Sequence, residues 1–237
     1  MDEKTWWIIV GGVKRLGLVL AQSLAENHKL VLTSSKALGG EEEVSKLSIS
    51  TDVRRLRWDA NDPQLVPKMM TDIEALRGEG IHLSGAIIAA GTFPFAPLGS
   101  WDMDSLQQTW QVNLTFPFLA IQSLAPHLMD GSCIQIILDT CIHRPWLNRL
   151  PYSSAKSGLE NLVYGLAQAL APGIRVVGHA IGAMLPDEGS DPDFLKDQTL
   201  LKRLGSPEDL IRAVNYVASS PYLTGEILTL DGGRRWV

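Results

Sequence analysis

Two residues of the 237-residue chain have the types and spacing needed for proton transfer. Tyr152 and Lys156 stand four positions apart in a Tyr-x-x-x-Lys segment, so on a helix both side chains share one face. A free phenol with a pKa of about 10 is a poor acid or base at neutral pH, and a fixed ammonium beside it lowers that pKa. The pair predicts acid–base chemistry at Tyr152, with Lys156 lowering the pKa of the phenol.

A glycine-bearing turn near the amino end is a candidate phosphate site. The turn follows the apolar run Trp6 to Val10 and opens a helical pattern, where backbone N–H groups and the helix dipole can hold a pyrophosphate. Glycines at such a turn also serve tight packing of the strand on the helix, so the turn alone does not decide its role. Its candidate cofactor contacts are Gly11, Lys14, Arg15, Leu16 and Gly17.

The residues after the second and third apolar runs indicate which dinucleotide would bind. Folds that select NAD usually place a carboxylate about 20 residues beyond the turn, whereas this chain has Ser34, Ser35 and Lys36. Two hydroxyls and an ammonium can bind a 2′-phosphate that a carboxylate would repel, so the sequence favours NADPH over NADH. Asp59 is placed to accept from the adenine amino group, or to cap a turn.

A parallel sheet would position these residues, because short apolar runs alternate with helical patterns along the chain. The runs are almost continuously apolar, as in strands covered on both faces. We expect seven strands at residues 6–10, 30–33, 55–58, 85–90, 132–138, 174–177 and 226–230, and helices at 15–27, 63–76, 103–129, 151–171 and 207–219. The segment 182–197 is expected to be irregular, and the stretch 184–201 to cover a substrate. The chain is therefore predicted to be a single α/β domain over residues 1–237, with a Rossmann-type, doubly wound, seven-stranded parallel sheet.

Composition argues against several classes of partner. With 21 Lys+Arg against 26 Asp+Glu, the net charge is −5 and no basic cluster indicates nucleic acid or anionic lipid. No apolar run approaches the roughly 20 residues of a membrane span, and the amino end lacks a signal-peptide pattern, so we expect a cytoplasmic protein. Two cysteines and five scattered histidines show no metal-binding spacing, and no metal is predicted.

Several of these motifs together resemble the short-chain dehydrogenase/reductases over nearly the whole chain. The matching features are the glycine turn with Arg15 in place of its middle glycine, Asn113 in Gln-Val-Asn-Leu, the Tyr152 and Lys156 pair, and the terminal Asp-Gly-Gly at 231–233. The resemblance implies an oxidoreductase that forms a homotetramer through the helices at 103–129 and 152–171. It also implies that Asn113 holds a water for proton relay, although Asn113 could equally be a structural helix residue.

Other positions carry cofactor contacts in that family or depart from its pattern. By resemblance Ala90, Gly91 and Gly182 lie at the cofactor, and so do Tyr152 and Lys156. The departures are Val10, Ile88 and Ile181, where the family usually has Thr, Asn and Pro. Val10 and Ile88 remove side chains that normally tie two strands together, so these changes affect the predicted cofactor site and not the catalytic set.

Asp139 is the most informative departure. The family normally has a serine thirteen positions before the tyrosine, where it donates a hydrogen bond to the substrate carbonyl, and this chain has Asp139 there. A carboxylate beside a ketone oxygen opposes the negative charge that grows during hydride attack, unless it is protonated. Beside a C=N bond it can stabilise a protonated nitrogen and pair with N–H donors. Asp139 therefore favours reduction of an imine in a ring such as a pterin.

The pteridine reductase subgroup is similar at these same positions. It has a turn like Gly-x-x-Lys-Arg-Leu-Gly, an aspartate in place of the serine, and a Ser/Thr-Phe pair that here is Thr92 and Phe93. By resemblance, Phe93 stacks on the pterin and Arg15 reaches both the cofactor phosphate and the substrate. Thr92, Asp139 and Tyr152 complete the predicted substrate site.

The leading hypothesis is NADPH-dependent reduction of a dihydropterin, with dihydrofolate or an oxidised pterin as further substrates. Hydride would go to a ring carbon and a proton to the adjacent nitrogen. One alternative is a short-chain reductase of another imine or ketone; a second is a catalytically silent NADPH-binding scaffold or sensor. Trp146 is a candidate for the substrate opening, whereas His143, His179 and Cys141 are interpreted as packing or loop residues.

Overall fold

The computed structural model describes residues 4–36, 41–186 and 189–237. The first three residues, which belong to the amino end examined for a signal peptide, lie outside the described residues. So do residues 187 and 188 of the segment expected to be irregular.

The described residues form a seven-stranded parallel sheet with the strand order β3-β2-β1-β4-β5-β6-β7. The order reverses beside β1, which creates the crevice at the carboxyl ends of the strands where doubly wound sheets bind ligands. The predicted fold class is thus confirmed. The strands are β1 Trp6–Val10, β2 Lys29–Ser34, β3 Val53–Arg57, β4 Leu83–Ile88, β5 Leu128–Asp139, β6 Ile174–Ile181 and β7 Glu226–Leu230.

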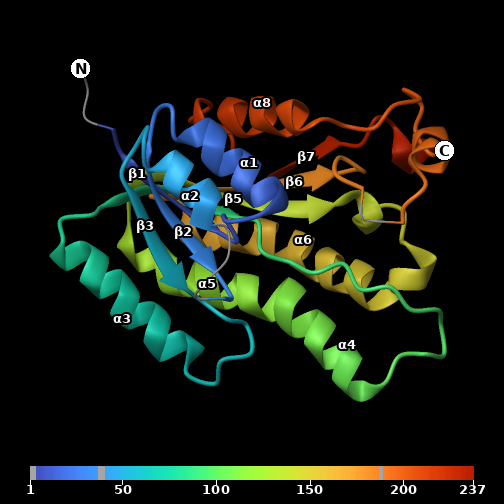
Figure 1. Ribbon diagram of the computed structural model, residues 1–237, viewed down its shortest axis with the longest axis horizontal. Helices are drawn as coiled ribbons and strands as arrows, with labels where there is room; N and C mark the ends of the chain where they lie inside the picture. The colour runs from blue at the N-terminus through green and yellow to red at the C-terminus, as the bar shows by residue number, and fades with distance from the viewer. Residues whose placement is uncertain (1–3, 37–40, 187–188) are drawn as a thin grey trace.

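Helices cover both faces of the sheet (Figure 1). One face carries α1 Arg15–Leu24, α2 Glu41–Leu47 and α8 Pro207–Ala218. The other carries α3 Leu65–Gly78, α4 Met103–Trp110, α5 Phe116–Leu124 and α6 Leu150–Leu170. Along β1, Ile8 and Val10 pack into the core on the α6 side and Ile9 into the core on the α1 side. Because strand side chains alternate between two buried faces, the run has to be apolar throughout.

The helix expected at 103–129 is interrupted and shorter than predicted. A π-helical turn, Gln111–Thr115, separates α4 from α5, and the chain passes through a short 3₁₀ turn into β5 at Leu128. Pro117 has no N–H to donate to the carbonyl of Asn113 four residues earlier, so the ladder widens there. Pro126 likewise cannot continue the helix, and residues 128 and 129 join the strand.

The segment expected to be irregular at 182–197 contains a short helix, α7 Pro192–Asp197. The Asp191 side chain caps it by accepting from the backbone N–H groups of Asp193 and Phe194. β6 also runs four residues beyond its predicted end, to Ile181, because it pairs with both β5 and β7.

The glycine turn between β1 and α1 is packed too closely for side chains. A Cβ on Gly17 would lie 2.0 Å from the Gly11 carbonyl oxygen. Gly11 has a φ of +86°, and a Cβ there would lie 2.8 Å from Ala90 at the end of β4. The close approach ties the turn to both β1 and β4, so it requires glycine for packing whatever it binds.

We expect Gly17→Ala to lower the free energy of unfolding by about 1–3 kcal/mol, because a methyl group there forces backbone to move. Urea unfolding followed by circular dichroism measures the change. Gly78→Ala is the matched control, since a Cβ on Gly78 meets nothing within 4 Å at the end of α3. Equal losses in both variants would contradict the interpretation.

Candidate active site

The end of β5 and the start of α6 bring Asp139 and Tyr152 together. The Tyr152 hydroxyl donates to Oδ2 of Asp139 over 3.1 Å. The other carboxylate oxygen, Oδ1, accepts from the Cys141 backbone N–H over 2.7 Å and from the Trp146 indole N–H over 3.3 Å. An ionised carboxylate is an acceptor only, and three donors converge on this one. The two predicted catalytic residues thus form a direct pair.

Lys156 is hydrogen-bonded to a backbone carbonyl and not to the Tyr152 hydroxyl. Its ammonium lies 5.8 Å from the centre of the Tyr152 ring and donates to the Ile137 carbonyl over 2.9 Å. Burial raises the pKa of Tyr152 well above its usual value, and the charge of Asp139 raises it further. Burial lowers the pKa of Lys156. The expectation of a lowered tyrosine pKa is therefore wrong for this arrangement, because burial and the Asp139 charge both favour the neutral phenol.

Asn113 lies fully buried in the π-helical turn and joins it to the loop after β4. Its side-chain N–H₂ donates to the Thr109 carbonyl over 2.9 Å and to the Thr92 hydroxyl over 3.2 Å, and its Oδ1 accepts from the Thr92 backbone N–H over 3.1 Å. A Cβ on Gly91 would lie 2.9 Å from that Oδ1 and 3.8 Å from the Lys156 ammonium. These contacts fit the structural interpretation of Asn113; the proton relay stays a prediction.

Phe93 forms an aromatic wall with two neighbours. Its ring packs edge-on against Tyr152, with centroids 4.8 Å apart, and against Trp146, at 6.2 Å. The guanidinium of Arg149 lies 3.6 Å over the Phe93 ring and also donates to the Phe93 carbonyl. Trp146 thus lies beside the Asp139–Tyr152 pair; its place at a substrate opening stays a prediction. Arg149 was not predicted, and no motif marks it.

Two basic side chains of the glycine turn are open to solvent. Lys14 and Arg15 are exposed, and Lys14 precedes α1 without a side-chain cap on the first N–H groups of the helix. Arg15 has a φ of +51°, in the region that glycine adopts without strain, which is a physical reason for a glycine at this position in other chains. Its guanidinium donates to the Leu185 carbonyl over 2.7 Å, linking the turn to the segment after β6.

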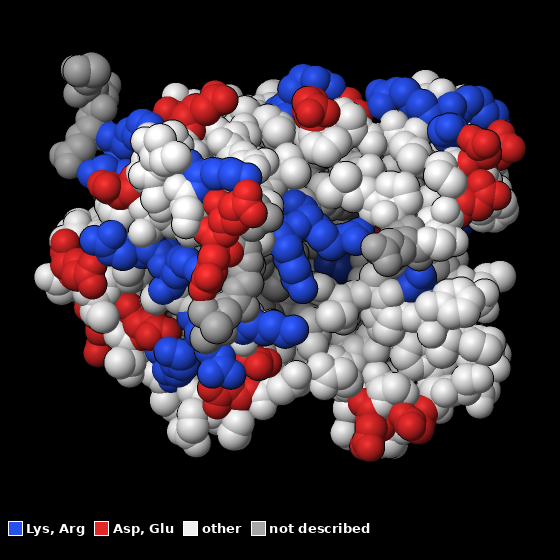
Figure 2. Space-filling model, in the orientation of Figure 1, with Lys and Arg blue, Asp and Glu red and all other residues white. Residues whose placement is uncertain are grey.

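A basic residue beside the β2 end was missed from the sequence. Arg57 stands opposite Ser34 in the register of β2 and β3, and its Nε donates to the Ser35 carbonyl over 3.2 Å. Lys36 and Arg57 are both exposed, and Figure 2 shows Lys and Arg side chains around the hollow in the middle of this face. Only the strand register brings Arg57 here. Asp59 accepts from the Asn61 N–H over 3.0 Å, in keeping with the cap that the sequence left open.

The family departures fall at well-packed positions. Val10 and Ile88 are partners in the pairing of β1 with β4, and both are buried. An apolar contact therefore replaces the expected polar tie between these strands. The Gly182 N–H donates to the Leu230 carbonyl over 2.9 Å, and a Cβ there would lie 2.9 Å from Asp231.

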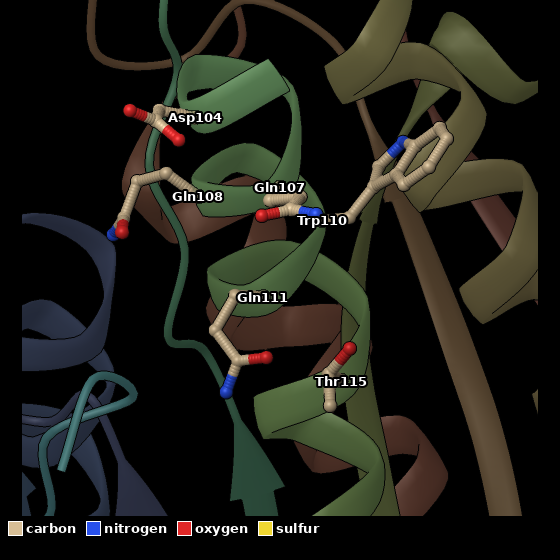
Figure 3. Close-up of a pocket in the computed structure, with 6 residues that line it drawn as sticks. All are labelled: Asp104, Gln107, Gln108, Trp110, Gln111 and Thr115. Atoms are coloured by element: carbon tan, nitrogen blue, oxygen red, sulfur yellow. The ribbon is translucent and has the colours of Figure 1, made fainter. Parts of the chain in front are cut away.

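A separate open hollow of about 600 Å³ lies along α4 and the π-helical turn (Figure 3). None of the predicted site residues lines it. The Trp110 indole at its edge donates to the Ser154 hydroxyl over 3.0 Å and joins α4 to α6. The homotetramer expected through these helices stays a prediction. The lining residues are Asp104, Gln107, Gln108, Trp110, Gln111 and Thr115.

The residues given no chemical role lie in packed positions. His179 is buried, its Nε2 lies 2.7 Å from the Gln135 side-chain oxygen, and burial lowers its pKa to about 4. Cys133 and Cys141 are buried free thiols. Within the described part of the chain, no group of three or more His, Cys, Asp or Glu side chains is arranged to hold a metal. No helix there is long and apolar enough to cross a membrane.

Comparison with known proteins gives one family model and several relatives that are enzymes of known name. A family model described as enoyl-(acyl carrier protein) reductase matches residues 13–235. Dihydromonapterin reductase of Klebsiella pneumoniae is 25% identical over 96% of this chain and 95% of its own length. Tropinone reductase-like 3 of Erythroxylum coca is 32% identical, over 54% of this chain; the chain spans only 53% of that protein's length.

Solved structures give the same fold. A short-chain dehydrogenase/reductase from Serratia marcescens superimposes with a TM-score of 0.88 at 26% identity, over 98% of each chain. A dehydrogenase/reductase from Sinorhizobium meliloti has a TM-score of 0.88 at 27% identity, over 97% of this chain and 94% of that one. With the family match over most of the chain, this protein belongs to the short-chain dehydrogenase/reductase family of oxidoreductases.

Proposed function

We propose that the protein is an NADPH-dependent reductase of a dihydropterin, with dihydrofolate or an oxidised pterin as further substrates. The observation that carries this proposal is the Asp139–Tyr152 pair, in which a carboxylate replaces the hydroxyl that serves ketone reduction. A carboxylate suits an N–H-rich heterocycle whose reacting nitrogen gains a proton. The dihydromonapterin reductases, aligned over nearly their whole length, support the same substrate class.

The family binds a nicotinamide cofactor, and the residues present fit NADPH. The close-packed turn leaves no room for side chains at Gly11 and Gly17, so backbone and the uncapped start of α1 face the place for the pyrophosphate. Arg57, together with Ser35 and Lys36, would bind the 2′-phosphate. Bound NADPH supplies the hydride. The full set of proposed contacts is Gly11, Lys14, Arg15, Leu16, Gly17, Ser34, Ser35, Lys36, Arg57, Asp59, Ala90, Gly91, Tyr152, Lys156 and Gly182.

The chain's own residues would handle the proton and the substrate ring. Tyr152 gives its hydroxyl proton to the ring nitrogen as the C=N electron pair moves onto that nitrogen. Asp139 accepts from N–H groups of the ring and so orients it. Lys156 would hold the nicotinamide ribose, and Phe93 would stack on the ring once the guanidinium of Arg149 leaves its face. Thr92 and Arg15 complete the proposed substrate site.

We expect the protein to oxidise NADPH in the presence of dihydrobiopterin, dihydromonapterin or dihydrofolate. The KM for NADPH should be lower than the KM for NADH. The absorbance of NADPH reports turnover, and a simple ketone is the comparison substrate. Turnover of the ketone alone would reject the proposal in favour of another short-chain reductase. NADPH binding without turnover of any substrate would identify a silent binding protein.

Asp139→Ser should lower pterin turnover by about 100-fold, because the proton-transfer pair and the ring contact are both lost. The same variant should raise ketone turnover relative to pterin turnover, since it restores a hydroxyl donor. Asp130→Ser is the matched control: Asp130 is an exposed acid at the opposite end of β5. A pterin rate that Asp139→Ser leaves unchanged would remove Asp139 from the mechanism.

Pterin turnover should stay flat as the pH rises from about 7 to 9, because the raised pKa keeps Tyr152 protonated over this range. The proton donor is the neutral phenol, so activity would fall only as the pH approaches the raised pKa. A pH profile of kcat tests this, with Tyr152→Phe as the inactive reference. A loss of kcat centred between pH 7 and 9 would instead support a tyrosine pKa lowered by Lys156.

A further inference from the structure

A buried arginine in the carboxyl-terminal segment has no place in the mechanism described so far. Arg234 is only 4% exposed, and its guanidinium lies 3.5 Å over the centre of the Trp146 ring. Its Nη1 donates to the Arg144 carbonyl over 3.3 Å, while its Nε is buried without a hydrogen-bond partner among the described residues. Burying a guanidinium this incompletely satisfied is costly. The Nε of Arg235 is also buried without a partner among the described residues, so the stack on Trp146 is what distinguishes Arg234.

The terminal Asp-Gly-Gly motif places this arginine. The two oxygens of Asp231 accept from the backbone N–H groups of Gly233, over 2.9 Å, and Arg235, over 3.0 Å. Gly232 and Gly233 have φ values of +60° and +81°, which glycine alone adopts readily. The resulting turn brings the end of the chain back to the carboxyl ends of the strands, where Figure 1 shows the C-terminus.

The stacked pair connects directly to the proton donor. Trp146 donates its indole N–H to Oδ1 of Asp139, over 3.3 Å, and Oδ2 of the same carboxylate accepts from Tyr152, over 3.1 Å. Arg144 closes the arrangement by donating to the Arg234 carbonyl over 3.3 Å. The contacts run in sequence from the arginine through the indole and the carboxylate to the phenol.

We propose that Arg234 is a positioning residue for the active site: it clamps Trp146 so that the indole N–H holds Asp139 in line with Tyr152. A flat guanidinium suits this stacking, and it adds a positive charge close to the carboxylate. This inference rests on the proposed function for its kinetic test, but the clamp itself is a property of the chain alone.

The kinetic test is a double-mutant cycle in the pterin assay. Arg234→Met and Trp146→Phe should each lower kcat by about tenfold with KM little changed, and the double variant should lose about tenfold in total rather than a hundredfold. Arg235→Met is the matched control, because that neighbouring side chain points to Thr229, with Nη1 2.9 Å from the hydroxyl. A hundredfold loss of kcat in the double variant would overturn the clamp and show that the two residues act independently. A raised KM with kcat intact would also overturn it and indicate direct contact with the substrate.

A second test does not depend on turnover. In protein with ¹⁵N-labelled tryptophan, the Trp146 indole N–H signal is identified by its absence in Trp146→Phe. Arg234→Met should shift this signal and speed its exchange with solvent, whereas Arg235→Met should leave it unchanged. An unmoved Trp146 signal in Arg234→Met would refute the clamp. Should Arg234→Met not fold, Arg234→Gln takes its place with the same expected results. Absence of pterin turnover in the wild-type protein would refute the proposed function and leave this test intact.

Discussion

The hydrogen bond between Tyr152 and Asp139 is the contact on which the proposed chemistry of this site depends. The Tyr152 hydroxyl donates its hydrogen bond to the carboxylate of Asp139. In most of the family a serine stands at the position of Asp139 and polarises the substrate oxygen. Burial and the neighbouring negative charge both raise the pKa of the phenol, which favours the proton-donor role proposed for Tyr152 over the role of a base. That state suits a reductase, which must deliver a proton to an atom that has received electrons.

Two secondary-structure elements and two neighbouring N–H groups hold the Asp139–Tyr152 pair in place. β5 ends at Asp139, and α6 presents Tyr152 in its first turn, so the two elements fix the two ends of the hydrogen bond. The backbone N–H of Cys141 and the indole of Trp146 satisfy the other carboxylate oxygen. The Lys156 ammonium donates to the backbone carbonyl of Ile137 and makes no hydrogen bond to the phenol oxygen. In this arrangement Asp139, and not Lys156, is the hydrogen-bond partner of the phenol.

Much of the fold followed from local signals, and the misses have physical causes. Continuous apolar runs identified the inner strands of the sheet, because strands covered on both faces leave no polar positions to confuse the pattern. The edge strand β3 carries three arginines and is at most partly buried, so its prediction did not rest on such a run. The helix expected at 103–129 is broken by Pro117 and Pro126. Each proline lacks the N–H that would donate to the carbonyl four residues earlier, so the regular helix cannot continue there. The helix α7 was missed because it is short and held by a side-chain cap rather than by an apolar stripe.

The sequence by itself determined the chemical groups: a phenol and an ammonium at helical spacing, a carboxylate thirteen positions earlier, and a glycine-bearing turn between the first strand and the first helix. Tertiary structure alone decided how they interact. Asp139, not Lys156, contacts the phenol oxygen, and burial of the phenol together with the Asp139 charge raises the tyrosine pKa instead of lowering it. Tertiary structure also placed three arginines near these groups. Strand register places Arg57, loop packing places Arg149, and the terminal turn places Arg234. Spacing along a chain sets which groups share an element, but burial and the nearest charge, which set their protonation, arise between elements distant in sequence.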